Sequence, residues 1–164
     1  MPLVPSYIKN LTSYKPGLRM DDVKRDKGLD RAIKLSSNEN SMGPAPLAIA
    51  AIESAMQKVN RYPDATGTAL RTKLAKKFDV KIENVIIGAG SEGIMSNILR
   101  TFLLGDDEIV AAADSFIGFR VLANATGRSI HWVPMENHRI NLDGIAEKIN
   151  DYTKIIYIAN PDNP

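Results

Sequence analysis

The chain has 164 residues, of which 44% are hydrophobic and 24% are charged, and its net charge is only +2. This is the composition of an ordinary soluble globular domain with its own core, and the small charge argues against a nucleic-acid partner. The sequence contains no cysteine, which excludes disulfides, zinc thiolate sites and a cysteine nucleophile. It has neither a signal-peptide pattern nor an apolar run near the ~18 residues of a membrane span. We therefore expect a cytoplasmic protein without membrane contact.

The first 45 residues differ in character from the rest of the chain. Residues 1–45 are interrupted by proline and glycine, which predicts an irregular N-terminal arm. Within it, only RAIKLSS (residues 31–37) has the composition of a short strand. From residue 46 onward the apolar pattern becomes regular, so we expect residues 46–164 to belong to a second, ordered region.

Two helices are predicted at the start of that ordered region. The stretch PLAIAAIESAMQKV (46–59) opens with proline, which suits a first helical turn, and repeats apolar residues at helical spacing. After the break RYPDATG, residues 68–78 carry apolar side chains four positions apart. Both stretches therefore predict amphipathic helices.

Short apolar runs and helical patterns alternate through the remainder of the chain. The runs are residues 85–87, 109–113, 130–133 and 155–159. A strand every ~20–25 residues with a helix between is the rhythm of a parallel sheet. The last run, IIYIA, is continuously apolar, which predicts a strand buried on both faces. The fold class is therefore α/β, with three layers and a mostly parallel sheet.

Ligands in such sheets collect at the carboxyl ends of the strands. The first predicted strand leads into Gly88-Ala-Gly90-Ser-Glu-Gly93 and then a helix, which favours a phosphate cradle at the helix N-terminus. A tight turn that binds nothing is the alternative. The phosphate could also belong to a dinucleotide, because Asp114 ends the next strand where a ribose-binding acid would lie. That second hypothesis is an NAD- or FAD-dependent oxidoreductase domain.

The ends of the next strands carry an aromatic and an amide. Phe116 follows the second predicted strand, where a ring could stack on a planar ligand or pack under the next helix. Asn160 is held at the tip of the last predicted strand by Pro161, and its amide can donate to a ligand oxygen. A plain Asn-Pro turn is the alternative. His131 and His138 form no cluster, and we expect no metal site.

Taken together, seven stretches resemble the pyridoxal-phosphate aminotransferases of fold type I, and within them the histidinol-phosphate aminotransferases. They are YKPG (14–17), KLSSNENSMGP (34–44), NRYPD (60–64), GTALR (67–71), ENVIIGAGSEG (83–93), DSFIGFR (114–120) and NPDNP (160–164). The resemblance covers nearly the whole chain and preserves the order of the motifs. Four positions differ from the family pattern: Ser41 and Asp114 stand where the family commonly has proline, Phe119 replaces a common tyrosine, and Asp162 lies where asparagine is frequent.

The resemblance implies roles for the strand ends, with pyridoxal 5′-phosphate as the cofactor. Backbone and side chains at Gly90, Ser91 and Glu92 would hold the cofactor phosphate. Phe116 would stack on the pyridine ring, and Asn160 would hydrogen-bond its phenolic oxygen.

It also implies roles for the loops that precede the sheet. Tyr62 would reach the cofactor phosphate of a neighbouring subunit, which makes a homodimer part of the site. Asn38 would lie near the substrate. Residues 1–45 would then be an arm with a substrate-side loop, and residues 46–164 the first part of the large cofactor-binding domain.

The activity implied is amino transfer between histidinol phosphate and 2-oxoglutarate in histidine biosynthesis. The Schiff-base lysine, the aspartate on the ring nitrogen and the substrate arginine would all lie beyond Pro164, so the 164-residue chain alone is expected to be inactive. A related decarboxylase of phosphothreonine shares many of these motifs and remains an alternative. A cofactor-free remnant or pseudo-enzyme is a third.

Overall fold

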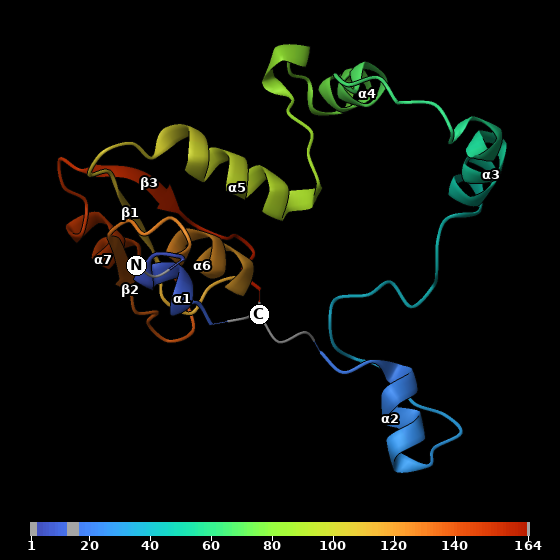
Figure 1. Ribbon diagram of the computed structural model, residues 1–164, viewed down its shortest axis with the longest axis horizontal. Helices are drawn as coiled ribbons and strands as arrows, with labels where there is room; N and C mark the ends of the chain where they lie inside the picture. Colours follow the sequence, from blue (N-terminus) through green and yellow to red (C-terminus); the bar gives the residue numbers. More distant parts are fainter. Residues whose placement is uncertain (1–2, 13–16, 164) are drawn as a thin grey trace. The chain divides into compact units, whose positions relative to one another are not determined.

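The computed structural model describes residues 3–12 and 17–163 (Figure 1). The chain divides into two compact units, one made of residues 1–14 and 75–164 and the other of residues 15–74. Residues 14–16 of the YKPG motif and Pro164 lie outside the described residues.

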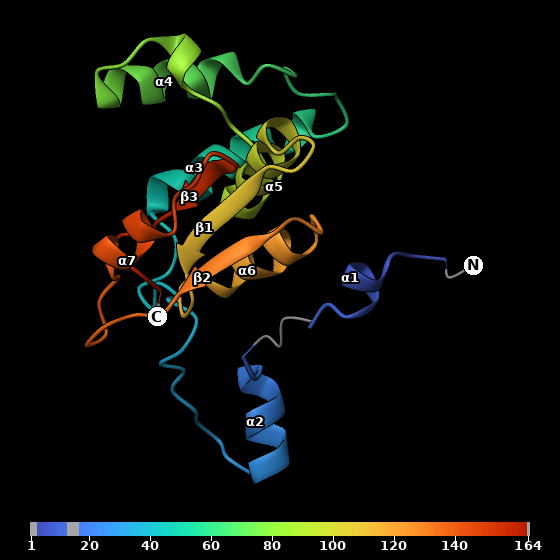
Figure 2. The ribbon, with the colours of Figure 1, turned by 90° about the vertical axis from the view of Figure 1, so that its left-hand side faces the viewer.

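The first unit is built around a parallel sheet. Its strands are β1 (Glu108–Ala112), β2 (Ile130–Val133) and β3 (Thr153–Tyr157), in the order β2-β1-β3. Figure 2 shows β1 between its two neighbours. Ile109 of β1 pairs in register with Ile130 on one side and Ile155 on the other. The parallel sheet predicted from the sequence rhythm is confirmed.

Helices connect and cover these strands. The helix α5 (Gly90–Phe102) precedes β1, α6 (Ile117–Asn124) joins β1 to β2, and α7 (Leu142–Glu147) joins β2 to β3. The Asn141 side chain accepts a hydrogen bond from the Gly144 N–H and so caps α7, as its position before an apolar run predicts.

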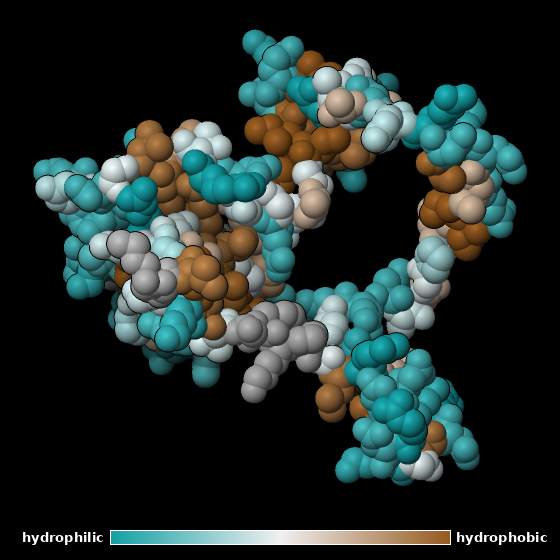
Figure 3. All heavy atoms as spheres, in the orientation of Figure 1, coloured by the Kyte–Doolittle hydropathy of each residue, from teal (hydrophilic) through white to brown (hydrophobic). Residues whose placement is uncertain are grey.

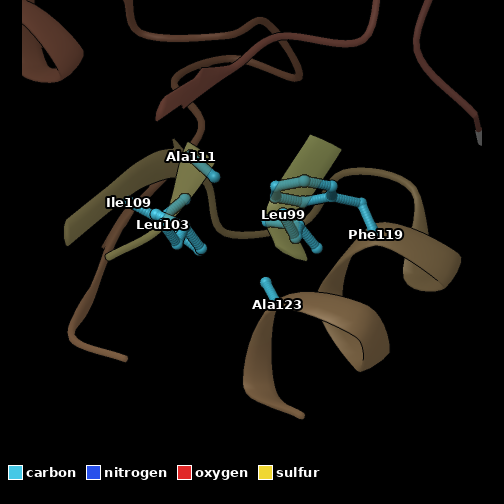
Figure 4. Close-up of a cluster of buried hydrophobic side chains, with 6 residues drawn as sticks. All are labelled: Leu99, Leu103, Ile109, Ala111, Phe119 and Ala123. Atoms are coloured by element: carbon cyan, nitrogen blue, oxygen red, sulfur yellow. The ribbon is translucent and has the colours of Figure 1, made fainter. Parts of the chain in front are cut away.

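Two apolar clusters on opposite faces of β1 make the core. Ile109 and Ala111 face α5 and α6, where they pack with Leu99, Leu103, Phe119 and Ala123 (Figure 4). Val110 points to the other face and packs with Val133 and with Ile145 of α7. Because successive strand residues alternate between faces, the unit has three layers, as expected for this fold class.

The position of the central strand differs from the sequence prediction. β3, expected to be buried on both faces, alternates between half-buried and exposed residues, and Ile156 is 45% exposed. β1 is the strand buried on both faces, with Ile109 and Val110 fully buried. The reason is strand order: β3 lies at an edge of the described sheet, so one of its flanks has no neighbouring strand.

Two predicted strands are not formed. Residues 85–87 are extended, with φ −110° and ψ 118° at Val85, but they belong to no strand among the described residues, and Ile86 is 77% exposed. They follow a short 3₁₀ turn, Ile82–Asn84. Residues 31–37 are also outside any strand, since the backbone turns at Ser37 with φ 72°. An apolar run becomes a strand only where a neighbouring backbone is free to pair with it.

The unit of residues 15–74 is helical. It contains α2 (Met20–Lys27), which ends at Gly28 with φ 62°, and α3 (Pro46–Ala55), which continues as a 3₁₀ turn, Met56–Lys58. The helix α4 (Thr68–Phe78) begins in this unit and has the bounds that the sequence predicts. Together with the short α1 (Ser6–Lys9), α2 shows that residues 1–45 are less irregular than expected.

The two units differ in how many of their residues are buried. No residue between 17 and 74 is buried, and apolar side chains of α3 lie open on its surface, as the hydrophobic atoms in Figure 3 show. Leu47 is 85% exposed there. Among the described residues, no helix is both long and apolar enough to cross a membrane.

Candidate functional site

The N-terminus of α5 has the features of an anion site. Gly90 adopts φ +68°, and the space where a Cβ would stand on it is open to 4 Å. No side chain caps the helix. The Gly90 N–H donates to the Gly88 carbonyl and the Gly93 N–H to the Ala89 carbonyl.

Two donors remain at this helix end. Within the described part of the chain, the N–H groups of Ser91 and Glu92 have no hydrogen-bond acceptor. Unpaired N–H groups in the first turn, together with the positive end of the helix dipole, attract an anion such as a phosphate.

Glu92 and Phe116 lie together in one hollow of about 250 Å³. Its lining residues are Glu92, Phe116, Ile117, Gly118, Val121 and Leu122. A Cβ on Gly118 would lie 2.5 Å from Cε1 of Phe116 and 2.8 Å from Oε1 of Glu92. The glycine therefore permits the close approach of the ring and the carboxylate to the start of α6.

This position of the Glu92 side chain refines its predicted role. A carboxylate repels a phosphate, and here it lies beside Phe116 at the start of α6. In the first turn of α5 its charge complements the helix dipole. What Glu92 can offer a phosphate is its backbone N–H.

The NPDNP motif is tied to the loop that follows β1. The Ser115 hydroxyl donates to Oδ1 of Asp162 at 2.7 Å, and the Asn163 N–H donates to the same oxygen at 2.9 Å. The other oxygen, Oδ2 of Asp162, is buried and has no partner among the described residues. The hydrogen bond joins the loops at the carboxyl ends of two neighbouring strands.

Asn160 lies in a different hollow, of about 350 Å³. It is lined by residues of the β2–α7 connection, of α7 and of the segment after β3, among them His138, Arg139, Leu142, Ile158, Asn160 and Asp162. Of the strand-end residues predicted from the sequence, the structure brings Glu92 and Phe116 into one hollow and Asn160 into another. Sequence reasoning missed Ser115 and Asp162, because a contact between residues 47 positions apart leaves no local signal.

Phe119, three residues after Phe116, packs in the core. Its ring stacks on Tyr157 of β3, with 3.6 Å between centroids and planes 5° apart. Burial, and then the negative charge of Asp162, raise the pKa of the Tyr157 hydroxyl. A short hydrogen bond from Arg120 to the Ala113 carbonyl, and the Trp132 ring 4.6 Å from the same guanidinium, hold the base of this loop.

Asn38 and Tyr62 belong to the helical unit. Asn38 follows Ser37 in a tight turn, and both residues have positive φ, 47° and 72°. Such conformations carry strain in residues other than glycine, and tend to occur at functional sites. Tyr62 is fully exposed.

Asp64, which belongs to the RYPD motif, has a structural role. Its carboxylate accepts hydrogen bonds from the Thr66 hydroxyl, the Thr66 N–H and the Thr68 N–H at the start of α4. These bonds, that of the Thr66 hydroxyl first, hold the pKa of Asp64 well below its usual range. The residue therefore fixes the turn between Tyr62 and the helix.

The amino end of the sheet has its own polar cluster. Oε2 of Glu108 lies 2.7 Å from Nε2 of His131 and accepts a hydrogen bond from the Asn150 amide at 2.8 Å. The Asn150 bond, and then His131, lower the pKa of Glu108. Among the described residues there is no group of three side chains suited to a metal ion.

A parallel α/β sheet with unpaired N–H groups at a helix end on its carboxyl edge is the arrangement of many enzymes that bind a phosphorylated ligand. The sequence profile of "Aminotransferase class I and II" matches residues 30–164, and the chain belongs to this family. The nucleotide-binding alternative has no support: its fingerprint requires a strand before the glycines, and residues 85–87 form none.

Two relatives show which aminotransferases the chain is similar to. The chain is 39% identical over 165 residues to histidinol-phosphate aminotransferase of Anaeromyxobacter sp., covering 100% of this chain and 45% of the relative. It is 37% identical over 164 residues to that of Halalkalibacterium halodurans, covering 100% and 44%. The resemblance drawn from the motifs is confirmed, and the chain spans about 45% of the length of these relatives.

Solved structures of aminotransferases are also similar to this chain. Histidinol-phosphate aminotransferase from Sinorhizobium meliloti, in complex with pyridoxal-5′-phosphate, superimposes with a TM-score of 0.83 at 25% identity, over 100% of this chain and 44% of that one. Aspartate aminotransferase from Thermotoga maritima gives 0.77 at 20% identity, over 98% and 46%, which supports the fold alone.

Proposed function

We propose that this chain forms the N-terminal part of a pyridoxal-phosphate-dependent aminotransferase that moves an amino group from histidinol phosphate to 2-oxoglutarate in histidine biosynthesis. The observation that carries the proposal is the arrangement at the carboxyl edge of the sheet, where an uncapped helix end with two unpaired N–H groups lies beside a hollow lined by Phe116. Similarity to histidinol-phosphate aminotransferases along the whole chain supports the choice of substrate.

The residues present fit the cofactor. The N–H groups of Ser91 and Glu92 would bind its phosphate, and the open space beside Gly90 leaves room for it. The Ser91 hydroxyl would add a further donor. Phe116 would offer its ring face to the pyridine. When bound, pyridoxal phosphate supplies the electron sink for amino transfer, and this part of the protein binds and orients it.

An amide from the NPDNP motif would contact the phenolic oxygen of the ring. Asn160 is the residue that the motif suggests, and it stays a candidate. Asn163 is a second one, because the Ser115–Asp162 hydrogen bond draws that end of the motif toward the loop of Phe116. Asn160 lines the other hollow, and so does Asp162. Comparing Asn160→Ala with Asn163→Ala separates the two: the residue that contacts the ring is the one whose loss weakens cofactor binding more.

The loops of the helical unit would complete the site. Asn38 would lie near the substrate, and the strained turn that holds it supports this role. Tyr62 is fully exposed, as a residue must be to reach the cofactor phosphate of a second subunit in a homodimer. In this proposal residues 1–45 are an arm with a substrate-side loop, residues 46–164 begin the large domain, and the protein works in the cytoplasm.

Cofactor binding is tested with two variants of one residue. Ser91→Pro removes one of the two unpaired N–H groups at a helical position where proline is tolerated, while Ser91→Ala keeps the N–H and removes only the hydroxyl. Titration of each with pyridoxal phosphate, followed by absorbance, should show the larger loss of affinity for the proline variant. Equal affinity for all three proteins would contradict a phosphate site at this helix end.

The substrate is tested in a protein of the relatives' full length. A chimera would carry residues 1–164 of this chain in place of the corresponding first 45% of the Anaeromyxobacter relative. We expect it to transfer the amino group of histidinol phosphate to 2-oxoglutarate, and to prefer that donor over aspartate and phosphothreonine. Preference for aspartate, or release of carbon dioxide from phosphothreonine, would contradict the proposal. The relative itself serves as the control.

A further inference from the structure

The loop after β1 and the loop after β3 are joined by one hydrogen bond. The Ser115 hydroxyl donates to Oδ1 of Asp162 at 2.7 Å, in a partly buried setting. These residues are 47 positions apart. Ser115 directly precedes Phe116, and Asp162 directly precedes Asn163, one of the two amides proposed for the cofactor contact.

The carboxylate of Asp162 is itself tightly fixed. The same Oδ1 also accepts the Asn163 N–H at 2.9 Å, so the side chain constrains the backbone of the residue after it. Its charge lies close enough to Tyr157 to affect that hydroxyl, and Tyr157 is stacked on the buried ring of Phe119. The two hydrogen bonds to Oδ1, from Ser115 and from the Asn163 N–H, thus fix the Asp162 side chain.

The environment of the second oxygen of Asp162 is energetically unfavourable. Oδ2 is buried without a partner among the described residues, and a buried acceptor left unpaired is unfavourable. A carboxylate that served only to end a strand would turn to water. The hydrogen bonds that offset this cost are those to Oδ1, and of the two only the one from Ser115 reaches a distant part of the chain.

We infer that Ser115 and Asp162 are a positioning pair that sets the Asn163 amide at a fixed spacing from the Phe116 ring. The inference rests on the proposed function, in which the ring of Phe116 and an amide of NPDNP contact the same cofactor. Neither Ser115 nor Asp162 touches the cofactor in this account. Ser115 acts by donating a hydrogen bond to Oδ1 of Asp162, and Asp162 acts by holding the backbone of Asn163.

The positioning role predicts that loss of the Ser115 hydroxyl affects the binding of two ligands differently. Inorganic phosphate would bind only at the N–H groups of Ser91 and Glu92, far along the chain from Asp162. Pyridoxal phosphate would use those groups and also the ring contacts. Loss of the Ser115 hydroxyl should therefore weaken binding of pyridoxal phosphate and leave binding of phosphate alone unchanged.

The test uses the 164-residue chain with Ser115→Ala, Ser115→Thr and the matched control Ser129→Ala, which removes an exposed serine hydroxyl from the same unit. We expect Ser115→Ala to raise the dissociation constant of pyridoxal phosphate about tenfold, the order of one hydrogen bond to a charged group. We expect exchange of the Asn163 N–H to become faster by a similar factor. Ser115→Thr, which keeps a hydroxyl, should restore both, and Ser129→Ala should change neither.

Three results would overturn the inference. They are wild-type affinity in Ser115→Ala, an equal loss of affinity for phosphate and for pyridoxal phosphate, and failure of Ser115→Thr to restore binding. If neither the wild-type chain nor the full-length chimera that carries its residues 1–164 binds pyridoxal phosphate, the proposed function fails and the positioning role fails with it; where only the chimera binds, the same variants are measured in the chimera. Intact wild-type binding with an unaffected Ser115→Ala overturns the positioning role alone.

Discussion

The sheet unit and the helical unit differ in what their apolar residues do. In the sheet unit α5, α6 and β1 send buried apolar side chains into the core: Leu99 from α5, Phe119 and Ala123 from α6, and from β1 Ile109 and Val110, which are fully inaccessible. In the helical unit the residues of α3 have an equally regular pattern, yet Ile52 is 63% exposed. Hydrophobic periodicity therefore predicts a helix in both units, but it does not say whether the helix has a partner.

The largest expected difference between the units is the cost of removing an isoleucine. Ile109→Ala empties a fully buried site between two helices and should lower the free energy of unfolding by about 2–5 kcal/mol. Ile52→Ala is the matched control in the helical unit and should change it by about 0.5 kcal/mol or less. Urea unfolding followed by the fluorescence of Trp132, the one tryptophan and a neighbour of the buried cluster, measures both. Similar losses for the two variants would erase the distinction.

A smaller effect on stability, with a clear effect on binding, is expected at Gly118. In Gly118→Ala the new methyl group would overlap the Phe116 ring and the Glu92 carboxylate, and both groups are ends of side chains that can move aside. We expect a loss of about 1 kcal/mol or less in unfolding free energy and several-fold weaker binding of pyridoxal phosphate. Calorimetric titration beside urea unfolding tests this, and unchanged cofactor affinity would count against a role for Phe116.

Asp64→Asn should act locally in the helical unit. The carboxylate accepts bonds from Thr66 and Thr68, so its loss should loosen the start of α4 and leave the unfolding of the sheet unit unchanged. Because folding lowers the pKa of Asp64, its contribution is present above the ordinary pKa near 4 and is lost as pH falls toward the folded value. Amide exchange at residues 68–71 should therefore differ between the variant and the wild type at pH 6, and the difference should be smaller at pH 3.

The smallest effect is expected at the amino end of the sheet. Hydrogen bonds from Asn150, and then the contact with His131, lower the pKa of Glu108, so its contribution is also present above its ordinary pKa and lost in acid. Glu108→Gln should lower the urea midpoint slightly at pH 7 and not at pH 3. A difference that grows toward pH 3 would have the wrong sign for this account.

The sequence predicts the alternation of strands and helices, because each element carries its own period. Helix 68–78 and strand 130–133 are examples, both found with the predicted bounds. It does not predict which strand is central. IIYIA is more apolar than EIVAA, yet the strand with two alanines is the buried one. Small side chains let helices approach closely, and strand order depends on the whole fold rather than on one segment.

In the site, too, some features follow from the local sequence and others depend on the whole fold. That Glu92 and Phe116 lie at one edge follows from their places in the chain: Phe116 comes after the carboxyl end of β1, and Glu92 is in the first turn of the helix that leads back to the start of β1. The direction of the Glu92 side chain depends on the absence of a side chain at Gly118, which the motif alone does not reveal. The Ser115–Asp162 bond joins two loops that are adjacent only because β1 and β3 pair.

The most direct test of the central claim is a titration of the ¹⁵N-labelled chain with pyridoxal phosphate, followed residue by residue through the amide resonances. The account predicts the largest shifts at Ser91 and Glu92, then at Phe116 and Asn163, with only the first pair responding to inorganic phosphate. Shifts confined to other parts of the chain, or an equal response to NAD at the same residues, would contradict it.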